Sequence, residues 1–206
     1  MAKRLVLLDF RLIGTVSSDV GKVIQVSVRT PIKEVFDKAA THARSVDGVD
    51  DLLICCHGFE ANGPVAGADI SIRTEGGLGL ELGMENLNFA TVGTMAVLKG
   101  PPPLAKRIVV FSCGAALTHP QLKNHHGDGM RLMGEIALTT GTRVVASNQT
   151  QVYHRLETLK HFLFGAGSAN DDRIDFGEWE GDVFEFSPDD GIGRKLKPAR
   201  HPQFDF

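Results

Sequence analysis

The stretch "LLICCHGFE" (residues 52–60) contains a row of apolar and thiol-bearing residues that runs directly into His57 and Gly58. A continuous apolar run of this length is typical of a β-strand that is buried on both faces of a parallel sheet. His57 then stands at the carboxyl end of that strand. Because open parallel sheets bind ligands at the carboxyl ends of their strands, His57 is a candidate functional residue.

Strands and helices are expected to alternate along the rest of the chain. Apolar runs bounded by turn residues predict strands, and apolar residues at helical spacing predict helices. The expected strands are residues 4–10, 22–28, 50–57, 107–113 and 142–148, and the expected helices are residues 31–46, 86–98 and 127–141. Residues 178–191 alternate apolar and polar side chains, which predicts an edge strand or hairpin. This order predicts an α/β fold with a mostly parallel central sheet and helices on both faces.

Composition narrows the class of protein. A chain of 206 residues with 42% hydrophobic residues is expected to form one domain, residues 1–206. A net charge of −3 without a basic run argues against a nucleic-acid partner. No apolar stretch reaches the roughly 18 residues of a membrane span. Asp9 and Arg11 interrupt the apolar start of the chain, so no signal peptide is expected.

The cysteine count points to a reducing compartment. The chain has three cysteines, an odd number without the spacing of a disulfide framework. Reduced thiols and a cytoplasmic site of synthesis are therefore expected. Cys55 and Cys56 are neighbours in one strand, so alternation sends their side chains to opposite faces of the sheet, where both are expected to be buried.

Cys113 repeats the setting of His57. Each ends an apolar strand and each is followed by a glycine, Gly58 or Gly114. On one edge of a sheet the imidazole could assist a thiolate nucleophile, and the glycines would let the backbone turn and present N–H groups to an oxyanion. In the alternative interpretation His57 merely ends a strand and Cys113 is an ordinary buried thiol. The shared setting of the two residues favours the catalytic interpretation.

Five segments of the chain carry a resemblance to a known family. They are "LLICCHGF", "GGLGLELG", "RIVVFSCGAA", "GDGMRLMGEIALTTGTRVVASN" and "WEGDVFEFSPDDG", which together cover residues 50–190 approximately. In this order they resemble the caspase-like cysteine peptidases of clan CD, and are most similar to bacterial CHAT-type and related caspase-like effector domains. The resemblance implies a caspase-like three-layer α/β/α sandwich with a mostly parallel central sheet.

The resemblance also implies an activity. Cys113 would be the nucleophile, His57 the general base or acid, and the main-chain N–H groups of Gly58 and Cys113 the oxyanion hole. The expected function is a cysteine endopeptidase that cuts protein or peptide substrates through a Cys-His dyad, with no cofactor and no metal. Caspases proper carry Gln-Ala-Cys-x-Gly, whereas this chain has "FSCGAA", so specificity for aspartate is not expected.

Bacterial proteins of this type act as toxins, immune effectors or partner-specific proteases. The resemblance therefore implies an effector or regulatory protease with an activator or partner protein, either cytoplasmic or delivered without a cleavable signal peptide. A catalytically inactive caspase-like interaction module is the alternative. The glycine-punctuated segment from Phe59 to Gly76 is either a substrate loop or lid, or a surface insertion, and composition suits both.

Other polar and aromatic clusters have simpler interpretations. His119, His125, His126 and Asp128 have side chains that suit zinc, and a metal-dependent hydrolase is the less favoured alternative because their spacing matches no zinc pattern. A polar loop before a helix, with Asp128 as the N-cap, explains them with fewer assumptions. The glycines of "GGLGLELG" lack the dinucleotide spacing, so no nucleotide cofactor is expected. Trp179 and Phe184 are expected to pack in the core or on an edge strand.

Overall fold

The computed structural model describes residues 3–59, 61–64, 71–74, 76–123, 127–151, 154–155, 174–175 and 177–204. The strands are β1 Arg4–Asp9, β2 Lys22–Val26, β3 Val49–Cys55, β4 His57–Gly58, β5 Ala61–Pro64, β6 Ser71–Thr74, β7 Leu80–Glu81, β8 Ala105–Phe111, β9 Arg143–Ser147, β10 His154–Arg155, β11 Ile174–Asp175, β12 Val183–Phe186 and β13 Gly193–Lys195. The helices are α1 Ile32–Ser45 and α2 Gly129–Thr140, with short 3-10 helices η1 Val92–Leu98, η2 Pro120–Leu122 and η3 Pro198–Arg200.

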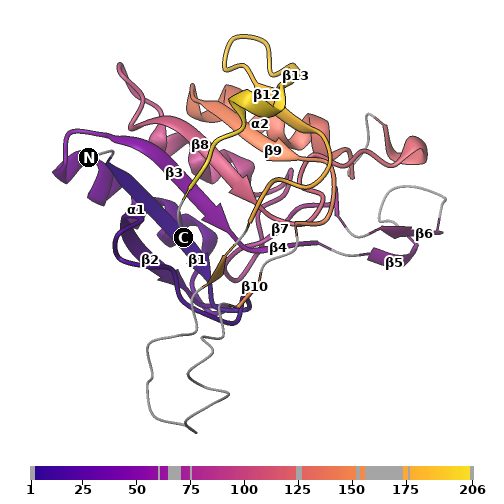
Figure 1. The fold of residues 1–206 in the computed structure, drawn as a ribbon, viewed down its shortest axis with the longest axis horizontal. Coiled ribbons are helices and arrows are strands. Elements are labelled where there is room, and N and C mark those ends of the chain that lie inside the picture. The colour runs from indigo at the N-terminus through magenta and orange to yellow at the C-terminus, as the bar shows by residue number, and fades with distance from the viewer. Residues whose placement is uncertain are drawn as a thin grey trace, which may run out of the picture.

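A seven-stranded sheet organises the molecule (Figure 1). Its strand order is β13-β12-β9-β8-β3-β1-β2, with β3 and β8 near the centre. The five strands from β2 to β9 are parallel, and β12 and β13 add an antiparallel edge. The predicted α/β fold with a mostly parallel sheet is confirmed. Of the edge strand or hairpin predicted in residues 178–191, the strand β12 is present, and its hairpin partner β13 follows just beyond that range.

Alternate residues of the central strands enter two apolar clusters, one on each face of the sheet. The larger cluster joins Leu52 and Ile54 of β3 to buried side chains of α1, η1 and α2. The smaller cluster contains Leu53 and Cys55 of the same strand. Among the described residues, loop and C-terminal side chains complete this smaller cluster: Leu12, Val16, Val20, Ile174, Trp179 and Phe204. The described α-helices thus form one layer, and the full three-layer sandwich stays a prediction.

Both α-helices follow from local sequence signals. In α1, buried side chains recur every three or four residues, which gives one face for the sheet. In α2, the Asp128 carboxylate accepts a hydrogen bond of 3.2 Å from the Arg131 N–H, so the predicted N-cap is confirmed. Gly141 ends the helix with a φ of +66°, a left-handed conformation that suits glycine.

The helix predicted over residues 86–98 is wrong in its first half. Only Val92–Leu98 is helical, as a 3-10 helix. Leu87 instead exchanges two backbone hydrogen bonds of 2.9 Å with Leu80. Asn86 adopts a positive φ of +61°, and the Asn88 N–H donates to the Thr91 hydroxyl. Pairing with Leu80 uses the backbone groups that a helix starting at residue 86 would need.

The remaining predictions for buried side chains are confirmed. Cys55 and Cys56 are both buried and belong to the clusters on opposite faces of the sheet. Trp179 stacks on Phe111 with ring centroids 4.6 Å apart, and Phe184 packs against the larger cluster. In the described part of the chain, neither α1 nor α2 combines the length with the apolar composition that a bilayer-crossing helix requires.

Alkaline pH should weaken the fold through the two buried thiols. Burial raises the pKa values of Cys55 and Cys56 above the ordinary value of 9.0, which unfolding restores. The folded chain then binds more protons than the unfolded chain above pH 9. The free energy of unfolding should therefore fall as pH rises, by up to about 1.4 kcal/mol per pH unit for each thiol.

Urea unfolding between pH 8 and pH 10 measures this effect. The wild-type protein should lose stability more steeply than a Cys55→Ala variant, which has one buried thiol fewer. Comparing the two slopes removes the contribution of lysines and other groups that titrate in the same range. Equal slopes would show that the Cys55 thiol does not resist ionisation in the folded state.

Candidate active site

The parallel pairing of β3 with β8 brings the two candidate residues to one level of the sheet. Cys55 is the register partner of Phe111, and the Cys56 N–H donates to the Phe111 carbonyl at 3.2 Å. His57 and Cys113 each lie two residues beyond the end of these strands, because β3 ends at Cys55 and β8 ends at Phe111. The segments that follow β3 and β8 both leave the sheet at its carboxyl edge, where the sequence predicted the site.

Gly58 packs directly on the backbone of Cys113. A Cβ atom added to Gly58 would overlap the Cys113 carbonyl oxygen and lie 3.2 Å from the Cys113 Cβ. Only a residue without a side chain permits this approach. The contact joins the residue after His57 to Cys113 itself, so the two sequence motifs meet in space.

A second glycine, Gly76, lies against the same backbone. A Cβ at Gly76 would lie 2.5 Å from the Cys113 carbonyl oxygen and 2.8 Å from the Gly114 Cα. Gly114 has a φ of +54°, so the sharp turn predicted after Cys113 is present. The sequence gives no sign that the first glycine of the "GG" at residues 76–77 packs on Cys113.

The His57 ring is partly buried and has a defined neighbour. Its Nε2 atom lies 3.3 Å from the main-chain oxygen of Arg11, in the loop that follows β1. Because a carbonyl oxygen only accepts hydrogen bonds, Nε2 must carry the proton in this contact. In the neutral ring Nδ1 is then the basic nitrogen.

Arg11, whose carbonyl contacts the His57 ring, is held by two acidic residues, and the sequence did not reveal this role. The Arg11 guanidinium lies 2.7 Å from the Asp9 carboxylate and 3.7 Å from that of Glu81, the cross-strand partner of His57. The hydrogen bonds that the Arg11 guanidinium donates to the Asp9 carboxylate are the main cause that raises the pKa of Arg11. Asp9 and Arg11 had been interpreted only as breaks in an apolar N-terminus. An acidic residue that ends a buried strand was the available signal.

Residues that follow β9 contact Cys113 from another direction. The Cys113 Sγ atom lies 3.7 Å from the Gln151 main-chain oxygen. The Gly114 N–H donates to the Gln149 carbonyl at 2.9 Å, so this N–H is already engaged. The Gln151 amide in turn donates to the Glu180 carbonyl at 2.9 Å. The nucleophile candidate, which is half-buried, is thereby contacted by Gly58, Gly76 and Gln151.

The Gly58 N–H is not used in the pairing of β4 with β7. Gly58 pairs with Leu80 in the short β4–β7 ladder, but both Leu80 backbone groups bond to Leu87. Gly58 and Leu80 therefore form a non-hydrogen-bonded pair, in which the backbone groups of Gly58 point away from β7. The roles of the Gly58 and Cys113 N–H groups in an oxyanion hole stay predictions.

The segment from Phe59 to Gly76 is only partly described. Residues 61–64 and 71–74 form an antiparallel pair, β5 and β6, which extends from the body of the molecule at the right of Figure 1. Residues 60, 65–70 and 75 lie outside the described residues. The hypothesis that this segment is a lid stays open.

The proposed metal cluster is also only partly described. His125 and His126 lie outside the described residues. His119 Nδ1 accepts a hydrogen bond from Gln121, and Asp128 caps α2. Within the described ranges, no group of three or more His, Cys, Asp or Glu side chains is placed to hold a metal ion.

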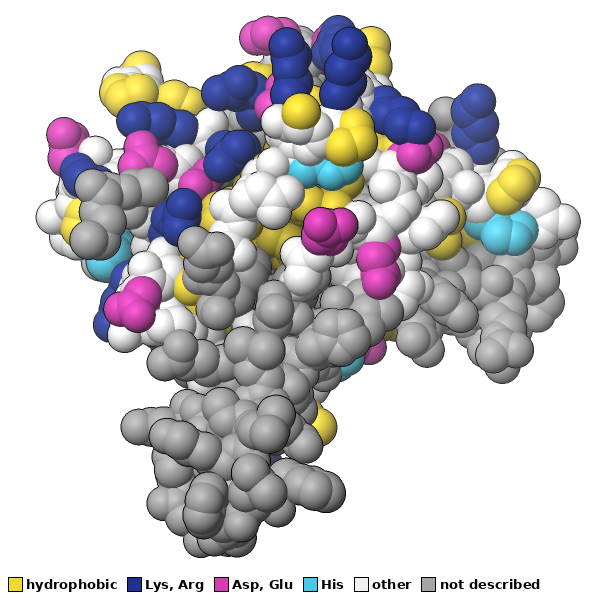
Figure 2. Space-filling view, in the orientation of Figure 1, with side chains coloured by type: hydrophobic (Ala, Val, Ile, Leu, Met, Phe, Trp, Pro, Cys, Tyr) yellow, Lys and Arg dark blue, Asp and Glu magenta, His cyan; other side chains and the backbone are white. Residues whose placement is uncertain are grey.

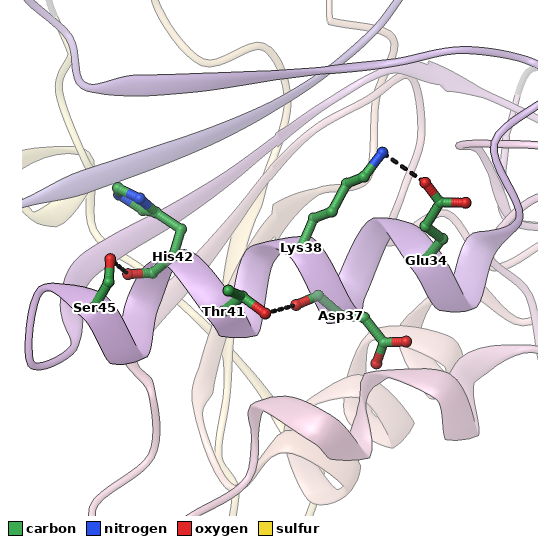
Figure 3. Close-up of a pocket in the computed structure, with 6 residues that line it drawn as sticks. All are labelled: Glu34, Asp37, Lys38, Thr41, His42 and Ser45. Atoms are coloured by element: carbon green, nitrogen blue, oxygen red, sulfur yellow. Dashed lines mark hydrogen bonds and ion pairs between the residues drawn. The ribbon is translucent and has the colours of Figure 1, made fainter.

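Two hollows lie away from the candidate site. One follows the outer face of α1, where polar side chains bond to each other or to their own helix, as in the 2.6 Å pair of Lys38 and Glu34 (Figure 3). The other, a cavity of about 520 Å³, lies at the amino ends of β3 and β8. Its cations are engaged: Lys106 pairs with Asp50 at 2.7 Å, and Lys3 donates to the Val46 carbonyl. Neither hollow contains His57 or Cys113.

Charged side chains are concentrated elsewhere on the surface. Figure 2 shows Lys and Arg gathered along the upper edge of one face, over β12 and β13, with Asp and Glu among them. Arg194 pairs with Asp190 at 2.7 Å, and Lys195 pairs with Asp182 at 2.6 Å. Arg194 and Lys195 on this edge are thus each balanced by an acidic side chain.

Comparison with protein-family models, curated protein sequences and solved structures found no match in any of the three. The caspase-like resemblance therefore rests on the motifs themselves.

Replacing Gly58 with alanine should damage the site and the fold together. The new Cβ would meet the Cys113 carbonyl, a backbone atom that cannot rotate away, and such overpacking costs about 1–3 kcal/mol. We expect a lower melting temperature and slower reaction of Cys113 with iodoacetamide, followed by peptide mass spectrometry.

Gly93 offers a matched control for this substitution. It lies in η1, and a Cβ added there would meet nothing within 4 Å. Gly93→Ala should leave stability within about 0.5 kcal/mol of wild type or raise it slightly. If Gly58→Ala behaved like Gly93→Ala, the close packing on Cys113 would not hold in solution.

Proposed function

We propose that the protein is a cysteine endopeptidase in which Cys113 is the nucleophile and His57 the general acid and base. The observation that carries this proposal is the packing of Gly58 and Gly76 on the Cys113 backbone. It supports a site in which a histidine and a cysteine, at the carboxyl ends of two neighbouring parallel strands, share one edge of the sheet. Such an edge is where α/β proteins bind ligands.

The proposed reaction follows the chemistry of a thiol nucleophile. His57 takes the Cys113 proton, and the thiolate attacks the carbonyl carbon of the scissile peptide bond. The Gly58 and Cys113 N–H groups stabilise the negative charge on the oxygen. His57 then gives its proton to the leaving amine, which departs and leaves a thioester on Cys113. Water hydrolyses the thioester, with His57 accepting the water proton, and the thiol is restored.

The contact between His57 and Arg11 supports the role of His57 as the general acid and base. A ring held through Nε2 keeps Nδ1 for the proton that moves between Cys113, the leaving amine and water. The two other cysteines are unsuited to attack, because burial raises the pKa values of Cys55 and Cys56 and disfavours their thiolates.

Exposed apolar side chains beside the site support a peptide substrate. Phe10 is 67% exposed and precedes Arg11, whose carbonyl contacts His57. Met84 is 54% exposed and follows Gly83, which bonds through both backbone groups to the Asp9–Arg11 pair. Exposed large apolar side chains are a common feature of binding surfaces.

Substitution of the dyad tests the proposal. Cys113→Ala and His57→Ala should each reduce peptidase turnover to background while the chain stays folded. The double variant should be no worse than either single variant, since nucleophile and base act as one unit. Turnover of fluorogenic peptides, assayed beside thermal melts, measures this.

The buried cysteines provide the control. Cys55→Ser and Cys56→Ser should lower the free energy of unfolding by about 1–3 kcal/mol, because each places a hydroxyl in an apolar strand. Folded molecules of these variants should keep full turnover. Activity that survives in Cys113→Ala would exclude the mechanism. An intact protein that cuts nothing, and whose Cys113 reacts with iodoacetamide no faster than an unstructured thiol, would instead favour the inactive interaction module.

The apolar residues beside the site should affect substrate binding more than chemistry. Phe10→Ser and Met84→Ser should each raise KM for peptides with large apolar residues about fivefold, the equivalent of about 1 kcal/mol, with kcat nearly unchanged. Ile192, which is 56% exposed in the β12–β13 hairpin, is the matched control. If Ile192→Ser raised KM as much as the other two, these residues would have no specific role in binding.

A further inference from the structure

We propose that Asp9 is a positioning residue that fixes, through Arg11, the orientation and tautomer of the His57 ring. The inference rests on the proposed function, because it assigns Asp9 to the proton transfer that His57 performs. The inference concerns the buried ion pair of Asp9 and Arg11, which is not part of the apolar core. The pair joins the loops on either side of the histidine.

The Asp9 carboxylate is the centre of this arrangement. Asp9 is the last residue of β1 and is 0% exposed, so its charge must be paired inside the protein. The Arg11 guanidinium contacts both carboxylate oxygens, Nε to Oδ1 at 2.7 Å and Nη2 to Oδ2 at 2.8 Å. Such a two-pronged contact fixes the plane of both groups.

The same carboxylate also fixes the Arg11 backbone. Oδ1 accepts a hydrogen bond of 3.0 Å from the Arg11 main-chain N–H. The Leu12 N–H donates to the Asp9 carbonyl at 3.0 Å and closes a turn with Arg11 inside it. With its side chain and N–H held by one residue, Arg11 has little freedom to rotate its carbonyl. That carbonyl is the group that lies 3.3 Å from His57 Nε2.

A second loop is tied to the same pair. The Gly83 N–H donates to Asp9 Oδ2 at 3.1 Å, and the Gly83 carbonyl accepts from Arg11 Nη2 at 3.2 Å. Arg11 Nη1 donates to the Asn86 side chain at 3.2 Å. Gly83 and Asn86 follow β7, whose Glu81 is opposite His57. The Asp9–Arg11 pair thus holds the strand beside His57 as well as the carbonyl in contact with its ring.

These contacts have a consequence for catalysis. As long as the Arg11 carbonyl is fixed, the neutral His57 ring carries its proton on Nε2 and presents Nδ1 as the base. The ring contacts Arg11 through its carbonyl, and the Arg11 guanidinium pairs with Asp9 and with Glu81, the cross-strand partner of His57. If the carbonyl were released, the ring could turn and exchange tautomers, and proton transfer with Cys113 would slow.

The chain contains its own comparison for Asp9. Asp51 is 4% exposed and lies on β3, six residues before His57, which is roughly 20 Å along an extended strand. Its Oδ1 atom lies 2.7 Å from both Nε and Nη2 of Arg107. Asp51 is therefore a similarly buried carboxylate at the other end of the sheet, paired to Arg107 and, at 3.6 Å, to Arg4. A purely structural role predicts the same phenotype for loss of either aspartate.

The first experiment compares Asp9→Asn with Asp51→Asn. Protein labelled with ¹⁵N-histidine reports the tautomer of His57, whose signals are assigned with a His57→Gln variant. Wild type and Asp51→Asn should show one neutral tautomer with the proton on Nε2, whereas Asp9→Asn should show a mixture. With a fluorogenic peptide, kcat of Asp9→Asn should fall roughly 10- to 100-fold with KM within about twofold. Asp51→Asn should keep kcat within about twofold although its melting temperature also falls.

A second pair keeps the test decisive if Asp9→Asn does not fold. Arg11→Lys retains a cation for Asp9 but removes the planar fork and its bonds to Gly83 and Asn86. It should shift the His57 tautomer signals and lower kcat about fivefold or more. Arg107→Lys makes the same change beside Asp51 and should do neither.

The outcomes separate this inference from the proposed function. Wild-type His57 signals and kcat in Arg11→Lys, or equal losses in the Asp9 and Asp51 variants, would overturn the positioning role of Asp9. A wild-type protein that cuts no peptide, together with a changed tautomer in Asp9→Asn, would support the positioning of His57 and refute the peptidase. The tautomer measurement needs no turnover. It therefore tests the positioning of His57 by Asp9 independently of the peptidase activity.

Discussion

The parallel pairing of β3 with β8 is the constraint from which the candidate site follows. Because side chains alternate along a strand, a slip of one residue would exchange the faces of Cys55 and Cys56 and move His57 away from the level of Cys113. Apolar packing on both faces of these strands prevents such a slip. The pairing that builds the core therefore also sets where the two catalytic candidates leave the sheet.

Each end of this sheet contains a buried aspartate paired to an arginine. Asp9 with Arg11 stands at the carboxyl edge, and Asp51 with Arg107 stands toward the amino edge. Burying charges in this way adds little net stability, because desolvation opposes the attraction between them. What such pairs supply is a unique geometry, since any other arrangement would leave a charge unpaired. At the carboxyl edge that geometry includes the Arg11 carbonyl and the loop after β7.

The second face of the sheet supports the same site from behind. Phe111, two residues before Cys113, stacks on Trp179 and meets the edge of Phe204 at 5.7 Å between ring centroids. The Trp179 indole donates to the Pro202 carbonyl, and the Arg4 guanidinium lies 5.0 Å from the centre of the Phe204 ring. The C-terminal part of the chain thus packs against the strand that carries the proposed nucleophile.

The sequence by itself determined most of the elements and the places where His57 and Cys113 stand. Apolar runs, the Asp128 cap and the Gly141 stop act through neighbouring residues, so they can be recognised without a fold. The helix expected over residues 86–98 failed because Leu87 pairs with Leu80 instead. Only the tertiary structure decided that Gly58 and Gly76 meet Cys113, and that Asp9 reaches Gly83. Those contacts join residues tens of positions apart, and strand order and register, rather than local preference, determine which of them meet.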